Sequence, residues 1–196
     1  MKKIFALLLT AFVALCANEL KFGTAANYPP FEYIDENNKI TGFDIDLIDE
    51  ISKRAGFSYK IINMSFDGLI PALKAGKING IISAMSATPD RLKSIDFTKP
   101  YYLTENIYLK KKGNDALKAK EELAGKRIGV QQGTIQELAA NAINGAKVVP
   151  AEDTVPLIMG LKVGKFDAEN LSKIAATRGQ IEYEFNFLQE KLKQRR

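Results

Sequence analysis

Residues 78–91 form the segment INGIISAMSATPDR, whose pattern indicates the fold class. Its first half is an apolar segment of strand length. Its second half passes through small polar residues to Pro89, and proline is common in the first turn of a helix. A buried strand that leads directly into a helix is the building unit of an α/β protein. We therefore predict a strand over residues 78–83 and a helix that begins at Pro89.

The residues before this stretch repeat the same order of elements. Residues 20–24 and 59–62 read as strands, and residues 67–75 read as a short helix. Between the first two strands, Asp44 can cap a helix whose apolar residues recur every three to four positions up to Gly56. This alternation of strands and helices predicts a parallel sheet with right-handed crossovers.

A polar segment divides the chain into two halves. Residues 110–114 read KKKGN, and after them a second series of helices and strands begins. We expect helices over 117–123, 134–144 and 155–163, with strands over 127–130, 148–149 and at Phe166. The predicted domains are a first lobe over 18–110, a partial second lobe over 111–168 and a divergent tail over 169–196.

Residues 1–17 have the features of a secretory signal peptide. A basic start is followed by an apolar run over 4–15 that contains 12 residues, fewer than the about 20 that a membrane span needs. Small residues then favour cleavage after Ala17. An alternative is a lipoprotein signal in which Cys16 is acylated, although the bulky Leu15 disfavours it.

Composition excludes several kinds of chemistry. The 196 residues contain no histidine and one cysteine, so histidine-based acid–base catalysis, Ser-His-Asp and Cys-His nucleophiles and His/Cys zinc sites are excluded. The net charge of +5 comes from the two ends, because residues 18–169 carry 20 acidic and 20 basic side chains. Nucleic acid is therefore not an expected partner.

Two loops carry candidate ligand-binding groups. The first holds Ser83, Ser86 and Arg91, and the second, within residues 130–137, holds Thr134 after a glycine turn. An arginine meets a carboxylate with two parallel hydrogen bonds, and ligands of open α/β sheets bind at the carboxyl ends of strands. Either loop alone is also consistent with an ordinary strand-to-helix connection. Together they predict an anion-binding cleft between the two lobes.

Aromatic residues also follow the predicted strand ends. Tyr28 and Phe66 are placed to flank the apolar part of a small ligand, whereas we expect Phe31 to lie in the core. The neighbouring acids Asp44 and Asp46 are interpreted as helix-capping and solvated charges, not as acid–base catalysts.

Several motifs, in order and spacing, resemble one family over residues 20–168: the amino-acid-binding proteins of bacterial ABC importers. They are Gly23-Thr24, Tyr28-Pro29-Pro30-Phe31-Glu32, Gly42-Phe43-Asp44-Ile45-Asp46-Leu47, Leu69-Ile70-Pro71-Ala72-Leu73, Thr88-Pro89-Asp90-Arg91, Asp96-Phe97-Thr98, Pro100-Tyr101-Tyr102 and Gly125-Lys126-Arg127-Ile128-Gly129-Val130. The resemblance implies an α/β, two-lobed periplasmic-binding-protein fold of type II. It also implies a monomeric periplasmic receptor that passes an amino acid to a membrane permease, with no cofactor, no metal and no enzymatic activity.

The resemblance also implies roles for the candidate residues. Arg91 would hold the ligand carboxylate with help from Ser86 and the Thr134 loop. Ser83 and neighbouring carbonyls would meet the ammonium group, and Tyr28 and Phe66 would flank the side chain.

The chain departs from the family pattern in a few places. Ala25 stands where relatives that prefer basic ligands have an acidic residue, which argues against a Lys, Arg or His ligand. Ile135 replaces a frequent hydroxyl residue, and Ser172 falls where the family has the aspartate that pairs with the ammonium group. Residues 169–196 do not follow the family, so we expect an incomplete second lobe and return strand.

Two other functions remain open at this point. One is an enzyme on the same scaffold, similar to periplasmic dehydratases of aromatic amino-acid precursors. It would need a general acid in the cleft, and the clamp loops offer no carboxylate for that role. The other is a truncated remnant of the receptor that no longer binds a ligand.

Overall fold

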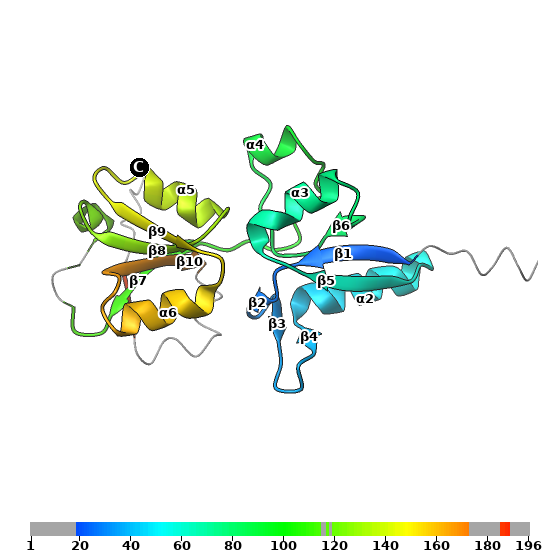
Figure 1. The fold of residues 1–196 in the computed structure, drawn as a ribbon, viewed down its shortest axis with the longest axis horizontal. Helices are drawn as coiled ribbons and strands as arrows, with labels where there is room; N and C mark the ends of the chain where they lie inside the picture. The colour runs from blue at the N-terminus through cyan, green and yellow to red at the C-terminus, as the bar shows by residue number, and fades with distance from the viewer. Residues whose placement is uncertain (1–18, 115–116, 118, 173–184, 189–196) are drawn as a thin grey trace, which may run out of the picture.

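The protein consists of two α/β lobes that lie side by side (Figure 1). The computed structural model describes residues 19–114, 117, 119–172 and 185–188. The signal peptide predicted over residues 1–17 and Cys16 lie outside these residues. Among the described residues, no helix has the length and apolar character that a membrane crossing requires. The α/β two-lobed fold predicted from the sequence is confirmed.

The first lobe is built on a parallel sheet in which β1 (Leu20–Thr24) lies between β5 (Tyr59–Asn63) and β6 (Gly80–Ile81). The connections are α2 (Phe43–Ala55), the 3-10 helix η2 (Phe66–Gly68) and α3 (Leu69–Lys74). The predicted parallel arrangement is therefore observed, with a third strand shorter than expected. After β6 the chain runs through the loop that carries the candidate arginine to α4 (Pro89–Leu92).

A small antiparallel sheet formed by β2 (Asn27–Tyr28), β3 (Glu32–Ile34) and β4 (Ile40–Thr41) leads into α2. Gly42 stands directly before this helix with φ of 124°, and a Cβ atom there would lie 2.3 Å from the carbonyl oxygen of Phe31. The prediction that Asp44 caps the helix is wrong, because the helix begins at Phe43 and no side chain caps it. Asp44 lies in the first turn and is completely buried.

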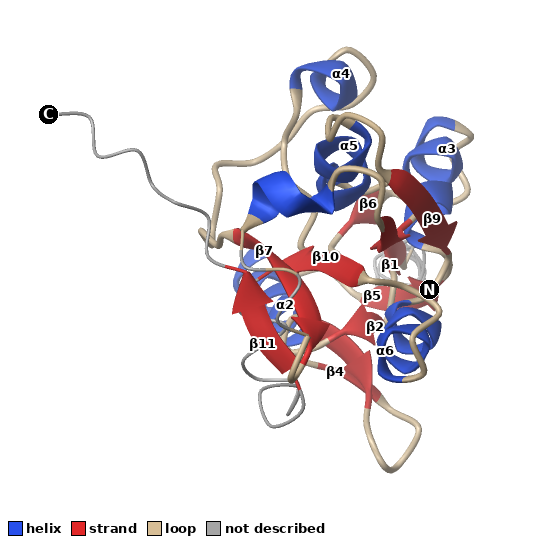
Figure 2. Ribbon diagram, turned by 90° about the vertical axis from the view of Figure 1, so that its left-hand side faces the viewer, coloured by secondary structure: helices blue, strands red, loops and turns tan. Residues whose placement is uncertain are grey.

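The second lobe contains a five-stranded mixed sheet with the order β11-β7-β10-β8-β9. Its strands are β7 (Asn106–Lys111), β8 (Arg127–Gln131), β9 (Lys147–Ala151), β10 (Ala168–Ser172) and β11 (Phe185–Leu188). Strand β7 runs antiparallel to both β10 and β11, whereas β10, β8 and β9 are parallel. Helices α5 (Ile135–Asn141) and α6 (Thr154–Lys162) cover opposite faces of this sheet (Figures 1 and 2).

The structure changes four predictions for the second lobe. The strand expected at Phe166 begins at Ala168 instead, as β10. The boundary after residue 110 cuts through β7, because this strand pairs with β10 and belongs to the second sheet. Glu169 was placed in a divergent tail, and it lies in β10. The helix expected over 117–123 is reduced to the 3-10 helix η3 (Lys120–Leu123).

Candidate ligand-binding site

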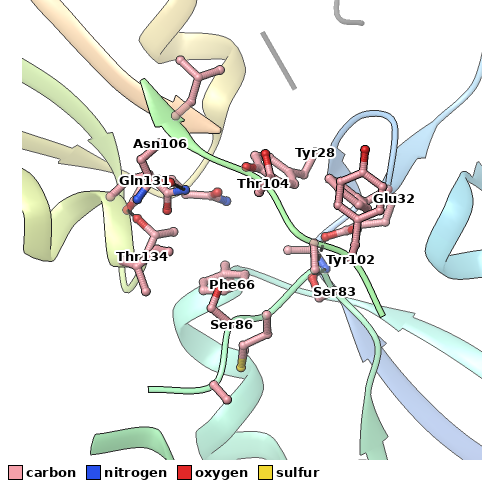
Figure 3. A pocket seen from close by; sticks show the side chains of 18 of the residues that line it. Tyr28, Glu32, Phe66, Ser83, Ser86, Tyr102, Thr104, Asn106, Gln131 and Thr134 are labelled. Carbon is pink, nitrogen blue, oxygen red and sulfur yellow. Dashed lines mark hydrogen bonds between the residues drawn. The ribbon is translucent and has the colours of Figure 1, made fainter. Parts of the chain in front are cut away.

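A cleft of about 420 Å³ lies between the two lobes (Figure 3). Residues that follow β1 and β6 line it from the first lobe, and residues of β8, α5, α6 and β10 line it from the second. The six residues singled out from the sequence are Tyr28, Phe66, Ser83, Ser86, Arg91 and Thr134, and all of them line this cleft. Their roles toward a ligand remain predictions.

Arg91 occupies the cleft at the start of α4. The Thr88 hydroxyl oxygen accepts a 3.2 Å hydrogen bond from the Arg91 backbone N–H, which caps the short helix. The guanidinium donates through Nη1 to the Ser86 carbonyl oxygen at 2.7 Å and through Nη2 to the Gly133 carbonyl oxygen at 2.8 Å. Its central carbon lies 5.4 Å from the centre of the Phe66 ring. Burial lowers the pKa of Arg91 from its usual value, but an arginine remains cationic at neutral pH.

Ser83 lies at the floor of the cleft and is only 2% exposed. Its hydroxyl accepts a hydrogen bond from the Ala25 backbone N–H at 3.0 Å and donates to Glu32 Oε1 at 2.8 Å. The Ser83 hydroxyl therefore connects the loop after β6 with Ala25 and Glu32, and these contacts stabilise the first-lobe wall of the cleft. A ligand ammonium group can still approach the hydroxyl oxygen, which has a second lone pair.

Thr134 caps α5 at the opposite wall. Its hydroxyl donates to the Gln131 carbonyl oxygen at 2.6 Å and accepts from the Glu137 backbone N–H at 3.2 Å. The glycine turn before it is held by the Glu137 carboxylate, which accepts from the Gly133 N–H at 2.7 Å. The same hydroxyl group therefore shapes the second-lobe loop.

The aromatic residues form one side of the cleft. The Tyr28 and Phe31 rings stack with centroids 5.9 Å apart and an interplanar angle of 14°. Phe31 is 3% exposed, which confirms its predicted place in the core. Phe66 is half-buried and lies beneath the Arg91 guanidinium.

A buried pair of acids, Glu32 and Asp44, lies at the base of the first lobe. Asp44 Oδ2 accepts from the Ala84 N–H at 2.6 Å and from the Tyr101 hydroxyl at 2.9 Å. Burial raises the pKa of both carboxyl groups, and the Asp44 charge raises the pKa of Glu32 further. The sequence interpretation of Asp44 as a solvated capping charge is therefore wrong. The pairing joins residues distant in sequence, so no local pattern signals it.

Among the described residues, hydrogen bonds that cross the cleft from lobe to lobe involve Arg91 and Asn27. One is the bond from Arg91 to the Gly133 carbonyl. Two others meet at Asn27, whose carbonyl oxygen accepts from the Thr154 hydroxyl at 2.8 Å and whose side-chain oxygen accepts from Gln131 at 3.3 Å. These contacts hold the two walls of the cleft against each other.

Glu169 is the acidic residue that the second lobe contributes to the cleft lining. Its side chain is 1% exposed, and within the described part of the chain neither carboxylate oxygen has a hydrogen-bond partner. Burial raises the pKa of Glu169 to about 8. From the sequence alone, no acidic residue is expected at this wall, because residues 169–196 depart from the family pattern and Glu169 falls in this tail. Over the described ranges, no cluster of three or more His, Cys, Asp or Glu residues could hold a metal ion.

Two α/β lobes with a charged and aromatic cleft between them define a two-lobed ligand-binding protein of the periplasmic-binding-protein class. Residues 20–182 match the family of bacterial extracellular solute-binding proteins, family 3, and the chain belongs to this family.

The relatives of this chain include binding proteins for basic amino acids. It is 54% identical over 149 residues to a probable histidine-binding protein of Campylobacter jejuni, covering 76% of this chain and 58% of that protein. It is 40% identical over 169 residues to the ABC transporter arginine-binding protein 1 of Escherichia coli, covering 85% and 69% of the two chains. The chain therefore spans less than two thirds of the Campylobacter relative.

Solved structures agree with this assignment. Holo ArgBP from T. maritima superimposes with a TM-score of 0.82 at 37% identity, covering 87% of this chain and 76% of that one. The ancestral amino acid-binding protein AncCDT-1, described as a precursor of cyclohexadienyl dehydratase, gives a TM-score of 0.83 at 32% identity, with coverages of 92% and 81%.

Proposed function

We propose that this protein is an extracytoplasmic receptor that captures one free amino acid between its lobes and delivers it to the permease of an ABC importer. The observation that carries the proposal is the position of Arg91, a half-buried cation in the cleft that contacts both lobes. The family and the names of the histidine- and arginine-binding relatives support it. In this role the chain is a periplasmic monomer.

The cleft offers a partner for each part of an amino acid. The Arg91 guanidinium has five N–H donors, of which two donate to the Ser86 and Gly133 carbonyls, so a carboxylate is its natural ligand. Tyr28 and Phe66 supply aromatic surface for the apolar part of the side chain. The Ser83 oxygen accepts a hydrogen bond from the ammonium group.

Binding is coupled to closure of the two lobes. A ligand held by residues of both lobes stabilises the closed arrangement more than the open one, and this difference shifts the population toward closure. The bonds from Thr154 and Gln131 to Asn27 support this step, because they form only when the lobes are together. The closed form is then what the permease recognises.

The sequence and the relatives point to different side chains on the ligand. Ala25 lies in the cleft lining with 1% exposure and offers no charge to a basic side chain. The named relatives bind histidine and arginine. A titration panel should therefore contain basic, polar and apolar amino acids.

Calorimetric titration of the full chain tests the proposal. We expect one-site binding of one amino acid, and we expect Arg91→Ala to abolish it because the carboxylate loses its cationic partner. Lys93→Ala is the matched control, since Lys93 is an exposed cation two residues away that pairs with Asp90. Equal binding by Arg91→Ala and Lys93→Ala would refute the carboxylate clamp, and no binding by the unaltered chain would refute the receptor.

A dehydratase is the second candidate function, and one observation favours it. A carboxyl group with a pKa near 8, as Glu169 has, remains protonated at neutral pH and can act as a general acid. We nevertheless propose a binding protein without catalysis, because the curated relatives are transport proteins. Incubation with prephenate or arogenate, followed by chromatography, distinguishes the two, and turnover would establish the enzyme.

A further inference from the structure

We propose that Glu169 is a specificity-determining residue whose carboxylate pairs with a cationic group of the bound amino acid. This inference rests on the proposed receptor function. Two observations carry it: Glu169 lines the cleft, and its two buried carboxylate oxygens have no partner within the described ranges. A buried carboxylate without a partner is unfavourable, so a cation that reaches it gains a strong, desolvated contact.

The position of Glu169 follows from the second sheet. Strand β10 lies between β7 and β8, where Glu169 is in register with Leu109 and Gly129. Side chains alternate along a strand, so Glu169 shares its face with Leu171, which packs with Leu109 and Leu161. The carboxyl group thus lies on an apolar face of the sheet, and Glu169 also lines the cleft.

No charged side chain of the surrounding elements balances this carboxylate. The titratable groups on the four elements that pack against β10 are Tyr108, Lys110, Lys111, Arg127, Glu137 and Lys162. Lys110 Nζ donates to the Asn114 and Leu117 carbonyl oxygens, and Arg127 forms an ion pair with Asp167 at 3.0 Å. The pKa of Glu169 is raised by burial without a contribution from any of these groups.

Arg91 and Glu169, two of the charged residues that line the cleft, come from different lobes. Arg91 belongs to the first lobe and Glu169 to the second, and both line the same 420 Å³ cavity. An amino acid carries the complementary pair, a carboxylate and a cation. A ligand that contacts Arg91 with the one and Glu169 with the other connects the lobes, so these contacts favour closure over the open form.

Pairing of Glu169 with a cation can be detected as the release of a proton on ligand binding. A nearby cation favours the charged form of a carboxyl group and lowers its pKa. Below pH 8 the buried Glu169 is largely protonated, so binding of a cation releases its proton. A residue that only fills space in the core releases none.

The experiment compares Glu169→Gln with Glu121→Gln, which makes the same substitution at an exposed position of the second lobe. Arginine, histidine and glutamine are titrated at pH 7 in two buffers of different ionisation enthalpy, which gives the number of protons released. For the unaltered chain and Glu121→Gln, we expect a release approaching one proton per ligand bound. For Glu169→Gln we expect no release and roughly tenfold or greater loss of affinity.

The three probes separate the possible sources of the cation. Loss of affinity for all three assigns the contact to the ammonium group, whereas loss for arginine or histidine alone assigns it to the side chain. Unchanged affinity and unchanged proton release in Glu169→Gln would overturn the inference while leaving the receptor function intact. Failure of the unaltered chain to bind any amino acid overturns both. A thermal melt confirms that each variant is folded.

Discussion

Burial shifts the pKa values of Arg91 and Glu169, two of the charged residues that line the cleft, in opposite directions. It lowers the pKa of Arg91, but the guanidinium stays cationic at neutral pH. It raises the pKa of Glu169 to about 8, so that this carboxyl group is largely neutral at pH 7. Arg91 therefore gives the cavity a positive charge at neutral pH, whereas Glu169 gives it a negative charge only when its carboxyl group is deprotonated.

The raised pKa of Glu169 predicts how stability depends on pH. Between the usual glutamate pKa of 4.5 and about 8, the folded chain holds a proton that the unfolded chain has released. The free energy of unfolding therefore falls as the pH rises through this window, by up to about 1.4 kcal/mol per pH unit for this group. Below and above the window, Glu169 contributes no slope.

Urea unfolding at several pH values between 4.5 and 8 measures this slope. Glu169→Gln should reduce it and should raise the stability near pH 8, because the uncharged amide avoids the cost of ionising a buried group. Glu32 and Asp44 keep their own raised pKa values and maintain part of the slope. The prediction would be contradicted if the free energy of unfolding of Glu169→Gln equalled that of Glu121→Gln at every pH.

At the scale of elements, the start of α2 depends on a backbone conformation that favours glycine. Gly42 has φ of 124°, and a Cβ atom there would lie 2.3 Å from the Phe31 carbonyl oxygen. We predict that Gly42→Ala lowers the free energy of unfolding by roughly 2–4 kcal/mol, through backbone strain and steric conflict with the preceding turn. Urea unfolding of the variant measures the loss.

Gly56 at the other end of α2 provides the control. Its φ is also positive, at 73°, but a Cβ atom there would have nothing within 4 Å. Gly56→Ala should therefore cost only about 1 kcal/mol, the strain of a left-handed alanine. Equal losses in the two variants would show that conformation alone, without the contact to Phe31, limits position 42.

The local elements of this fold could be predicted because they follow from local periodicity. The strand over Leu20–Thr24, the helix up to Gly56 and the glycine turn before Thr134 all appear close to their expected places. The six candidate residues also come together, because loops after strands of each lobe open toward one cleft. Strand ends and helix starts are thus sufficient to locate the cavity.

Partners distant in sequence could not be predicted in the same way. Residues 106–109 read as a strand, but nothing in them indicates that they pair with β10 and not with the first sheet. In the sequence, Asp44 has the position of a helix cap. In the fold, its carboxylate accepts hydrogen bonds from the Ala84 N–H and the Tyr101 hydroxyl, which are distant in sequence. Glu169 looks like a tail residue because its burial is created only when β10 lies between β7 and β8.

At the scale of the whole molecule, Asn27 joins the lobes through both its backbone and its side chain. We predict that Thr154→Val opens the cleft, because it removes the hydroxyl that donates to the Asn27 carbonyl and leaves the shape of residue 154 almost unchanged. Small-angle X-ray scattering without added ligand should give a larger radius of gyration than for the unaltered chain.

Thr41→Val is the matched control for this measurement. Thr41 lies in β4, outside the cleft lining. Its replacement should leave the scattering profile as it is. If Thr154→Val and Thr41→Val scatter identically, the bond to Asn27 does not contribute to holding the lobes together.

We expect the bonds across the cleft to affect the kinetics of ligand capture. The cleft opens fully only after the contacts of Asn27 with Thr154 and Gln131 have broken. At low ligand concentration the observed association rate rises in proportion to concentration. At high concentration it should reach a plateau at the rate of lobe opening, so the proposed receptor would have a maximum loading rate that is a property of the protein and not of its ligand.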